Sequence, residues 1–338
     1  MSISKLWATI QAKWNIIDIP IEDHLRDTNQ EHLPQTKLLV DAVNKLEDNL
    51  TEAYLRGSFA YGDADVHSDI DLFVVVPPEK LAQTYQQFVD FLNEDYSVLV
   101  FCHDRLVKDY GGIGFMFIVK DENDKLFQFD FYMAMTGVPP KVPLRNHPRI
   151  YTENPEYCWL EENKAKPLPK SAQKFIEHYT ANDNAEKKDI NAELEYQLVD
   201  LLVALNIFQK HVTRCQYGRA LTDNNHVLST CVEMLRALAK DDSPHTSLYT
   251  VDKLIKTCKE DGLFADKANR LNDLLLAKPS NQKVIDIFDL GISIIKDHCP
   301  EVYTKLRSSI DEYERLVINP LRNAEGRNNN PQFGYGLR

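Results

Sequence analysis

Three aspartates and a Gly-Ser pair are the residues of this chain whose types and spacing could do chemistry. Asp69 and Asp71 follow the Gly57-Ser58 pair after ten intervening residues, and the apolar run 72–76 comes directly afterwards. Side chains alternate along a strand, so both carboxylates are expected on the same face. Two neighbouring carboxylates repel each other and are costly to bury, and a divalent cation with oxygen ligands removes both costs.

The Gly-Ser pair follows residues 53–56, which we interpret as a short strand. Glycine lets the backbone approach a ligand closely. The N–H groups of Gly57 and Ser58, together with the Ser58 hydroxyl, could hold a terminal phosphate. Serine is also a common helix cap, a role that is compatible with phosphate binding. The pair therefore indicates a triphosphate site beside the two carboxylates.

A third carboxylate, Asp130, lies in the strictly alternating segment 126–132. Three phenylalanines of this segment share one face, and Gln128, Asp130 and Tyr132 share the other. Residues 113–119 are also strand-like, and a polar turn at 121–124 separates the two segments. The pattern predicts a hairpin that places Asp130 beside Asp69 and Asp71. The alternative is that Asp130 is an ordinary surface residue of a strand.

Together these residues resemble the signature of the DNA polymerase β-like nucleotidyltransferase superfamily. That signature is Gly-Ser, a spacer, Asp-x-Asp and a later Asp on a neighbouring strand, and the resemblance covers residues 36–135. The matching residues are Gly57, Ser58, Asp69, Asp71 and Asp130. The run from His67 to Leu72 and the helical second half look most like the bacterial nucleotidyltransferases that modify aminoglycosides or lincosamides.

The resemblance implies an α+β fold, with a mixed sheet, flanking helices and a C-terminal helical bundle. It implies transfer of a nucleoside monophosphate from ATP or another NTP to a hydroxyl of a small-molecule acceptor. Asp69, Asp71 and Asp130 would hold two Mg²⁺ ions and act as the catalytic residues. Gly57 and Ser58 would bind the nucleotide.

Three other functions remain open at this point. A synthase of cyclic dinucleotides or oligonucleotides, like cyclic GMP-AMP synthase, shares the same three carboxylates and a helical second half. A nucleotidylating toxin or antitoxin would modify tRNA or a protein instead. A catalytically inactive binding module could also have kept the fold, although the intact set of aspartates argues against it.

Other polar residues near the motif have plainer interpretations. His67 is expected to be a loop residue satisfied by hydrogen bonds, and Asp63 and Asp65 fit a polar loop. Arg56 is as readily a solvated charge as a phosphate contact, and we leave it outside the predicted site.

Composition limits the partners. The chain has 338 residues, 43% hydrophobic and 27% charged, which is typical of a soluble globular protein of two domains. Six scattered cysteines without metal spacing, no apolar run of membrane-spanning length and no signal-peptide layout predict a cytoplasmic protein. The net charge of −12 argues against nucleic acid as a partner and favours a cationic acceptor. The sequence indicates no oligomeric state.

The expected organisation has three parts. Residues 1–145 form the nucleotidyltransferase domain, 146–325 a helical acceptor-binding domain and 326–338 a loose tail. Seven prolines between 137 and 169 predict an interdomain connection. Residues 1–34 look irregular, with helical character near 7–14. The stretch 194–212 is apolar almost all round, as in a central bundle helix.

Two polar groups accompany this central helix. Glu193, Gln197 and Asp200 form a stripe that faces either solvent or an acceptor. Lys210, Arg214 and Arg219 follow, and these charges either complement the end of the helix or reach phosphates.

Overall fold

The computed structural model describes residues 17–105, 112–140, 147–181, 189–240, 251–262 and 264–328. The chain divides into two compact units, residues 1–183 and 184–338. No helix within the described ranges is long and apolar enough to cross a membrane. The segment near 7–14 with expected helical character lies outside the described residues.

The first unit is built on a mixed sheet, which has seven strands in the described residues and the order β1-β7-β2-β3-β6-β5-β4. The strands are β1 (Ile17–Asp18), β2 (Glu52–Leu55), β3 (Ile70–Val76), β4 (Ser97–His103), β5 (Gly112–Lys120), β6 (Leu126–Met135) and β7 (Pro148–Thr152). β3 and β6 are neighbours near the centre and run parallel. β5 pairs antiparallel with both β4 and β6, so the predicted hairpin is present. This mixed sheet with helices agrees with the expected α+β class.

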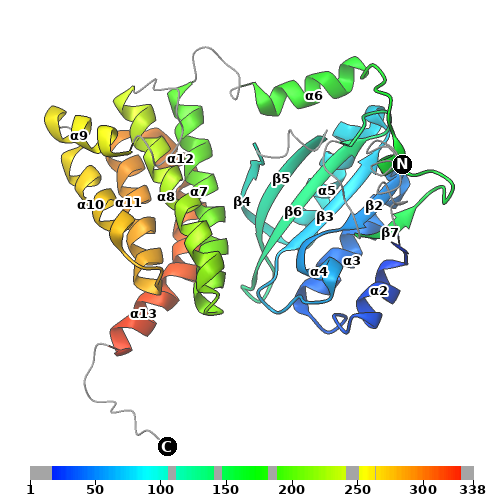
Figure 1. Ribbon diagram of the computed structural model, residues 1–338, viewed down its shortest axis with the longest axis horizontal. Helices are drawn as coiled ribbons and strands as arrows, with labels where there is room; N and C mark the ends of the chain where they lie inside the picture. Colours follow the sequence, from blue (N-terminus) through cyan, green and yellow to red (C-terminus); the bar gives the residue numbers. More distant parts are fainter. Residues whose placement is uncertain are drawn as a thin grey trace, which may run out of the picture. The chain divides into compact units, whose positions relative to one another are not determined.

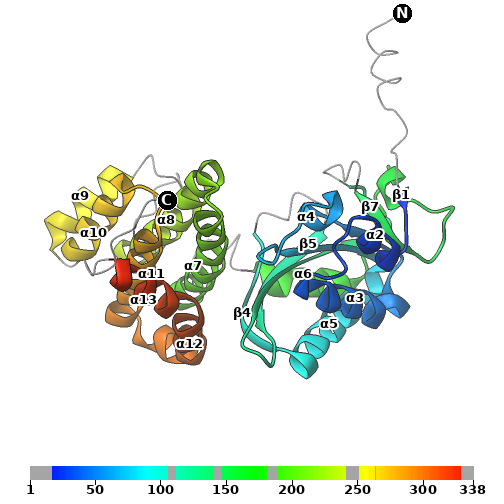
Figure 2. The same ribbon diagram turned by 90° about the horizontal axis from the view of Figure 1, so that it is seen from below.

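Helices cover one face of this sheet. They are α2 (Ile21–Asp27), α3 (Pro34–Leu46), α5 (Leu81–Asp95) and α6 (Lys170–Thr180), and the short α4 (Gly57–Tyr61) follows β2. Figure 2 shows α3 and α5 together beneath the sheet. α2 was missed because the sequence predicted irregular structure up to residue 34. With 7 residues, α2 is too short to show a clear helical periodicity of apolar residues.

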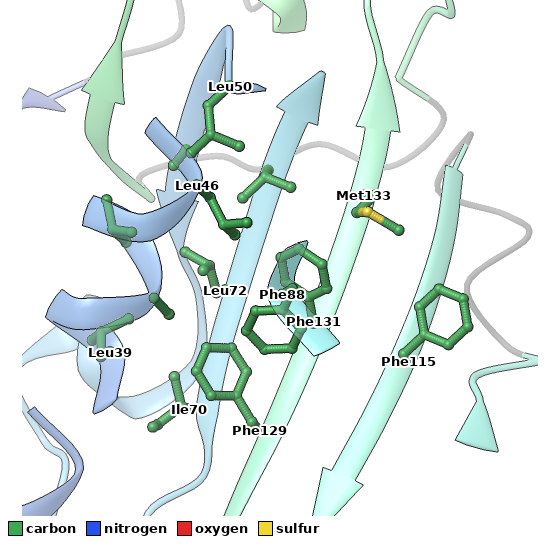
Figure 3. Close-up of a cluster of buried hydrophobic side chains, with 14 of the residues drawn as sticks. Leu39, Leu46, Leu50, Ile70, Leu72, Phe88, Phe115, Phe129, Phe131 and Met133 are labelled. Atoms are coloured by element: carbon green, nitrogen blue, oxygen red, sulfur yellow. The ribbon is translucent and has the colours of Figure 1, made fainter. Parts of the chain in front are cut away.

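Phenylalanines fill the core between the sheet and α5. Phe88 of α5 stacks on Phe131 of β6, with ring centroids 4.1 Å apart, and meets Phe129 edge-on. Figure 3 shows these rings together, with the α3 leucines beside β3. The alternating phenylalanines of β6 therefore face the helices, and this orientation leaves the polar side chains of β6 on the opposite face.

An aromatic cluster covers the opposite face at one end of the central strands. Tyr54, Phe73 and Tyr132 pack there beneath Trp159 of the 3₁₀ helix η4 (Trp159–Glu161). The Trp159 indole N–H donates to the carbonyl oxygen of Val138, 2.8 Å away. This small cluster covers the ends of β3 and β6 that lie beyond Asp71 and Asp130 in the chain.

The proline-rich segment 137–169 belongs to the first compact unit, whose boundary at 183/184 differs from the expected domain boundary at 145/146. The segment contributes β7 and η4, and the unit continues through α6 to residue 183. The buried guanidinium of Arg149 in β7 donates two hydrogen bonds to Asp18, at 2.6 and 2.8 Å, and pairs with Glu52. These long-range partners could not be read from proline content.

The second unit is a helical bundle, as expected (Figure 1). Its described elements are α7 (Ile190–Thr213), α8 (Tyr217–Ala239), α9 (Val251–Asp261), α10 (Ala265–Leu276), α11 (Asn281–His298), α12 (Pro300–Tyr313), the π-helical turn η6 (Glu314–Ile318) and α13 (Asn319–Asn328). α7 is buried over most of its length, as its apolar sequence predicts. A Cβ on Gly291 of α11 would lie 2.1 Å from Leu201 Cδ2, so glycine allows these helices to pack closely. Of the expected loose tail, 326–328 are the end of α13, and 329–338 lie outside the described residues.

Candidate active site

Asp71 and Asp130 lie directly opposite each other on adjacent parallel strands. The register pairs Ile70 with Phe129 and Asp71 with Asp130. Because both strands alternate in the same phase, the two carboxylates share the sheet face opposite the one that packs against α5. Asp71 is half-buried, whereas Asp130 is only 8% exposed.

Asp69 completes the group of three carboxylates. It directly precedes β3 and is half-buried. Burial raises the pKa of Asp130 well above its usual value, and the negative charges of Asp71 and then Asp69 raise this pKa further. All three aspartates are therefore close enough to interact electrostatically, and their mutual repulsion is the condition that a bound cation relieves.

The Gly-Ser turn touches this group through Gly57. Gly57 has a positive φ of +57°, and a Cβ at this position would lie 2.1 Å from the Asp71 Oδ2 atom. The neighbouring Arg56 N–H donates to the Asp71 carbonyl oxygen at 3.0 Å. Ser58 follows in the first turn of α4 and is half-buried. The structure thus places the Gly-Ser pair against the Asp-x-Asp motif.

Buried polar side chains fix the loop between α4 and β3. The Gln35 amide of α3 donates to the carbonyl oxygens of Asp65 and Ser68, each at 3.0 Å. The Asp65 carboxylate accepts from the His67 N–H at 2.9 Å. Asp65 and the exposed His67 are therefore loop residues, in agreement with their plainer interpretation. Because Ser68 directly precedes Asp69, Gln35 also helps to position that aspartate.

Two further charged residues lie near the carboxylates. The Arg56 guanidinium carbon is 4.9 Å from the centre of the Tyr132 ring, on the strand that carries Asp130. Burial raises the pKa of Tyr132, and Asp130, Asp71 and Asp104 add to that rise, while Arg56 opposes it. Asp104 follows β4, and its N–H donates to the Gly114 carbonyl oxygen at 2.8 Å.

Neither Arg56 nor Asp104 was predicted from the sequence as part of the site. Arg56 directly precedes the Gly-Ser pair, and this adjacency was the available signal. Asp104 has no motif, because its proximity depends on how β4 and β5 pair.

The two groups of polar residues that the sequence indicated in the helical unit lie on α7 and at the start of α8. Glu193, Gln197 and Asp200 are all buried, so they do not form a solvated stripe. Gln197 donates to Glu193 at 2.9 Å, and Asp200 lies 3.6 Å from a ring nitrogen of His226. Lys210 and Arg214 lie at the C-terminal end of α7, where positive charge complements the helix dipole. Arg219 lies in the first turns of α8 and is exposed.

The carboxylate oxygens of Asp69, Asp71 and Asp130 suit a hard divalent cation when substrate phosphates supply the remaining ligands. In the described ranges, no group of three or more His, Cys, Asp or Glu side chains is arranged to hold a metal ion by itself. Mg²⁺ is commonly held by one or two carboxylates plus substrate phosphates. The half-buried Asp71 and the buried Asp130 repel each other, so this pair fits a cation site that a substrate completes.

Comparison with known proteins agrees with this geometry. Residues 37–114 match the family model described as a nucleotidyltransferase domain. The matched range includes Gly57, Ser58, Asp69 and Asp71 and ends before Asp130. No curated protein matches the chain at a significant level. The match supports a nucleotidyltransferase enzyme whose nucleotidyltransferase domain includes residues 37–114.

Proposed function

We propose that the chain transfers a nucleoside monophosphate from an NTP, with ATP as the expected donor, to a hydroxyl of a small-molecule acceptor. The observation that carries the proposal is the contact of Gly57 with Asp71, directly opposite Asp130. In this arrangement a turn that could bind phosphate lies against carboxylates that could bind metal. The nucleotidyltransferase family match on residues 37–114 supports the same reaction class.

Asp69, Asp71 and Asp130 would together hold two Mg²⁺ ions. When bound, such ions lower the pKa of an attacking hydroxyl and neutralise charge on the phosphates. The N–H groups of Gly57 and Ser58 and the Ser58 hydroxyl would hold oxygens of the triphosphate. These roles divide the site into a nucleotide side and a carboxylate side.

In the reaction, the acceptor oxygen forms a bond to the α-phosphorus, and the bond from that phosphorus to the bridging oxygen breaks. Pyrophosphate leaves, and the acceptor loses its hydroxyl proton. Asp130 would accept or guide this proton, because it lies directly opposite Asp71 in the group of three carboxylates. A separate general base is the alternative.

The helical unit would supply the specificity for the acceptor, and cationic aminoglycosides are the first candidates, followed by lincosamides. The net charge of −12 supports an acceptor that carries positive charge. No feature of the described site distinguishes the four nucleobases, so each NTP belongs in the test.

The test is a panel of aminoglycosides and lincosamides, each incubated with each NTP and Mg²⁺, with pyrophosphate release and acceptor mass as readouts. We expect an acceptor-dependent product, and Asp69→Ala should lower kcat/KM at least about a hundredfold. Asp63→Ala is the matched control. Asp63 lies in the same loop as Asp69 but outside the group of three carboxylates.

Other outcomes would redirect the assignment. Nucleotide products formed from NTP alone would indicate a cyclic-dinucleotide or oligonucleotide synthase. Labelled tRNA or protein would indicate a toxin–antitoxin component. Turnover that is unchanged by Asp69→Ala would refute the site itself.

A further inference from the structure

The strand that carries Asp130 also carries a buried amide on the same face. Gln128 lies two residues before Asp130 in β6 and has no exposed surface. Its Nε2 atom donates to the Asp130 Oδ1 atom at 3.1 Å. The residue opposite Gln128 on β5 is the fully buried Ile118. A polar amide in such surroundings is costly unless it is hydrogen-bonded.

The register places this amide beside the whole group of carboxylates. The parallel pairing of β3 and β6 starts with Ile70 and Phe129, and the residues directly before them are Asp69 and Gln128. Asp69 and Asp71 are therefore two residues apart at the start of β3, and Gln128 and Asp130 have the same spacing beside them on β6. Three of these four positions are carboxylates, and Gln128 is the neutral donor among them.

We propose that Gln128 is a positioning residue, which holds the Asp130 carboxylate in the orientation that receives a divalent cation. This inference rests on the proposed function. Its hydrogen bond occupies Oδ1, and Oδ2 takes no part in that bond. Hydrogen bonds that orient metal-binding carboxylates commonly set metal affinity.

The chemical type of the side chain fits this role. A lysine or arginine at residue 128 would place a positive charge beside Asp130 and compete with the cation. A glutamate would add a fourth negative charge and could not donate. An amide restricts the rotation of the carboxylate without changing the charge of the site.

The test compares Gln128→Met and Gln128→Leu with the wild type. Both variants remove the amide donor and replace it with an apolar side chain of similar size. The readout is Mn²⁺ binding in the presence of a non-hydrolysable NTP analogue, followed by electron paramagnetic resonance of the free ion. We expect Mn²⁺ affinity to fall about tenfold, with unchanged affinity for the metal-free nucleotide.

Thr84→Val is the matched control, because it removes a fully buried donor in helix α5, where the Thr84 hydroxyl donates to the Lys80 carbonyl oxygen at 2.9 Å. It should bind Mn²⁺ as the wild type does. A thermal unfolding curve without metal accompanies each variant. Folded Gln128 variants with wild-type Mn²⁺ affinity would overturn the proposal. Loss of folding in both variants would also overturn it, because the role of Gln128 would then be structural.

Asp130→Asn separates this inference from the proposed function. If Asp130→Asn weakens Mn²⁺ binding and the Gln128 variants do not, only the positioning role fails. If Asp130→Asn also binds Mn²⁺ normally, the metal site itself is wrong.

Discussion

Gly57 and Asp71 lie so close together that a side chain at position 57 would displace the Asp71 carboxylate. A Cβ there would come within 2.1 Å of the Asp71 carboxylate, and the positive φ of Gly57 is itself unfavourable for any L side chain. The turn that is proposed to bind phosphate and the carboxylate that is proposed to bind metal are therefore built as one unit.

Gly57→Ala should consequently cost both stability and activity. The left-handed backbone alone should lower the free energy of unfolding by about 1–2 kcal/mol. Displacement of the Asp71 carboxylate should in addition lower the kcat/KM of the folded enzyme. Thermal denaturation and steady-state kinetics measure the two effects. Gly262→Ala is the control, because Gly262 has a similar φ of +70° and a Cβ added there would meet no atom within 4 Å. Equal kinetic losses in the two variants would contradict a specific role for the Gly57 contact.

Asp130→Asn should stabilise the metal-free protein while it abolishes turnover. The folded pKa of Asp130 is raised, so the folded state holds this proton more tightly than the unfolded chain does. Stability is therefore lost as pH rises from the ordinary aspartate pKa, near 3.8, through the raised folded pKa. The asparagine variant lacks this titration. Unfolding followed in EDTA from about pH 4 to about pH 8 should show a smaller loss of stability in the variant, and identical pH profiles would exclude the predicted burial cost.

Gln35→Leu should weaken the positioning of the Asp-x-Asp motif from the far side of the loop. It removes both hydrogen bonds that hold the Asp65 and Ser68 carbonyls, so the unfolding free energy should fall by about 1–3 kcal/mol. Turnover should also fall at temperatures where the variant is fully folded. A variant that is less stable but fully active would show that Gln35 serves only the fold.

Phe88→Ala tests the division into two units. Phe88 is fully buried against Phe131 and Phe129, and its truncation should cost about 3–5 kcal/mol. The loss should be confined to the unit that contains residues 1–183. Differential scanning calorimetry should show one transition moved to lower temperature and a second unchanged. A single transition that moves as a whole would contradict independent units.

The sequence predicted the strands of the site well, because their patterns are local. The apolar run after Asp71 and the alternation around Asp130 each define a strand and its polar face without tertiary information. The structure then supplies the parallel register that places these two residues opposite each other. The contact of Gly57 with Asp71 also depends on that tertiary arrangement.

Features that depend on distant partners were not predictable in this way. β7 joins the sheet through Arg149, whose partners Asp18 and Glu52 are 131 and 97 residues away in the chain. Asp104 approaches Asp130 only because β4, β5 and β6 pair in sequence. Local composition instead predicts a linker where β7 lies, and it predicts no site residue at Asp104.

A crystal structure of the protein with Mn²⁺ and a non-hydrolysable NTP analogue tests the central claim most directly. We expect anomalous Mn²⁺ peaks at coordination distance, about 2.0–2.2 Å, from oxygens of Asp71 and Asp130, with the triphosphate against the N–H groups of Gly57 and Ser58. Metal and triphosphate bound elsewhere, with these carboxylates free of both, would contradict it.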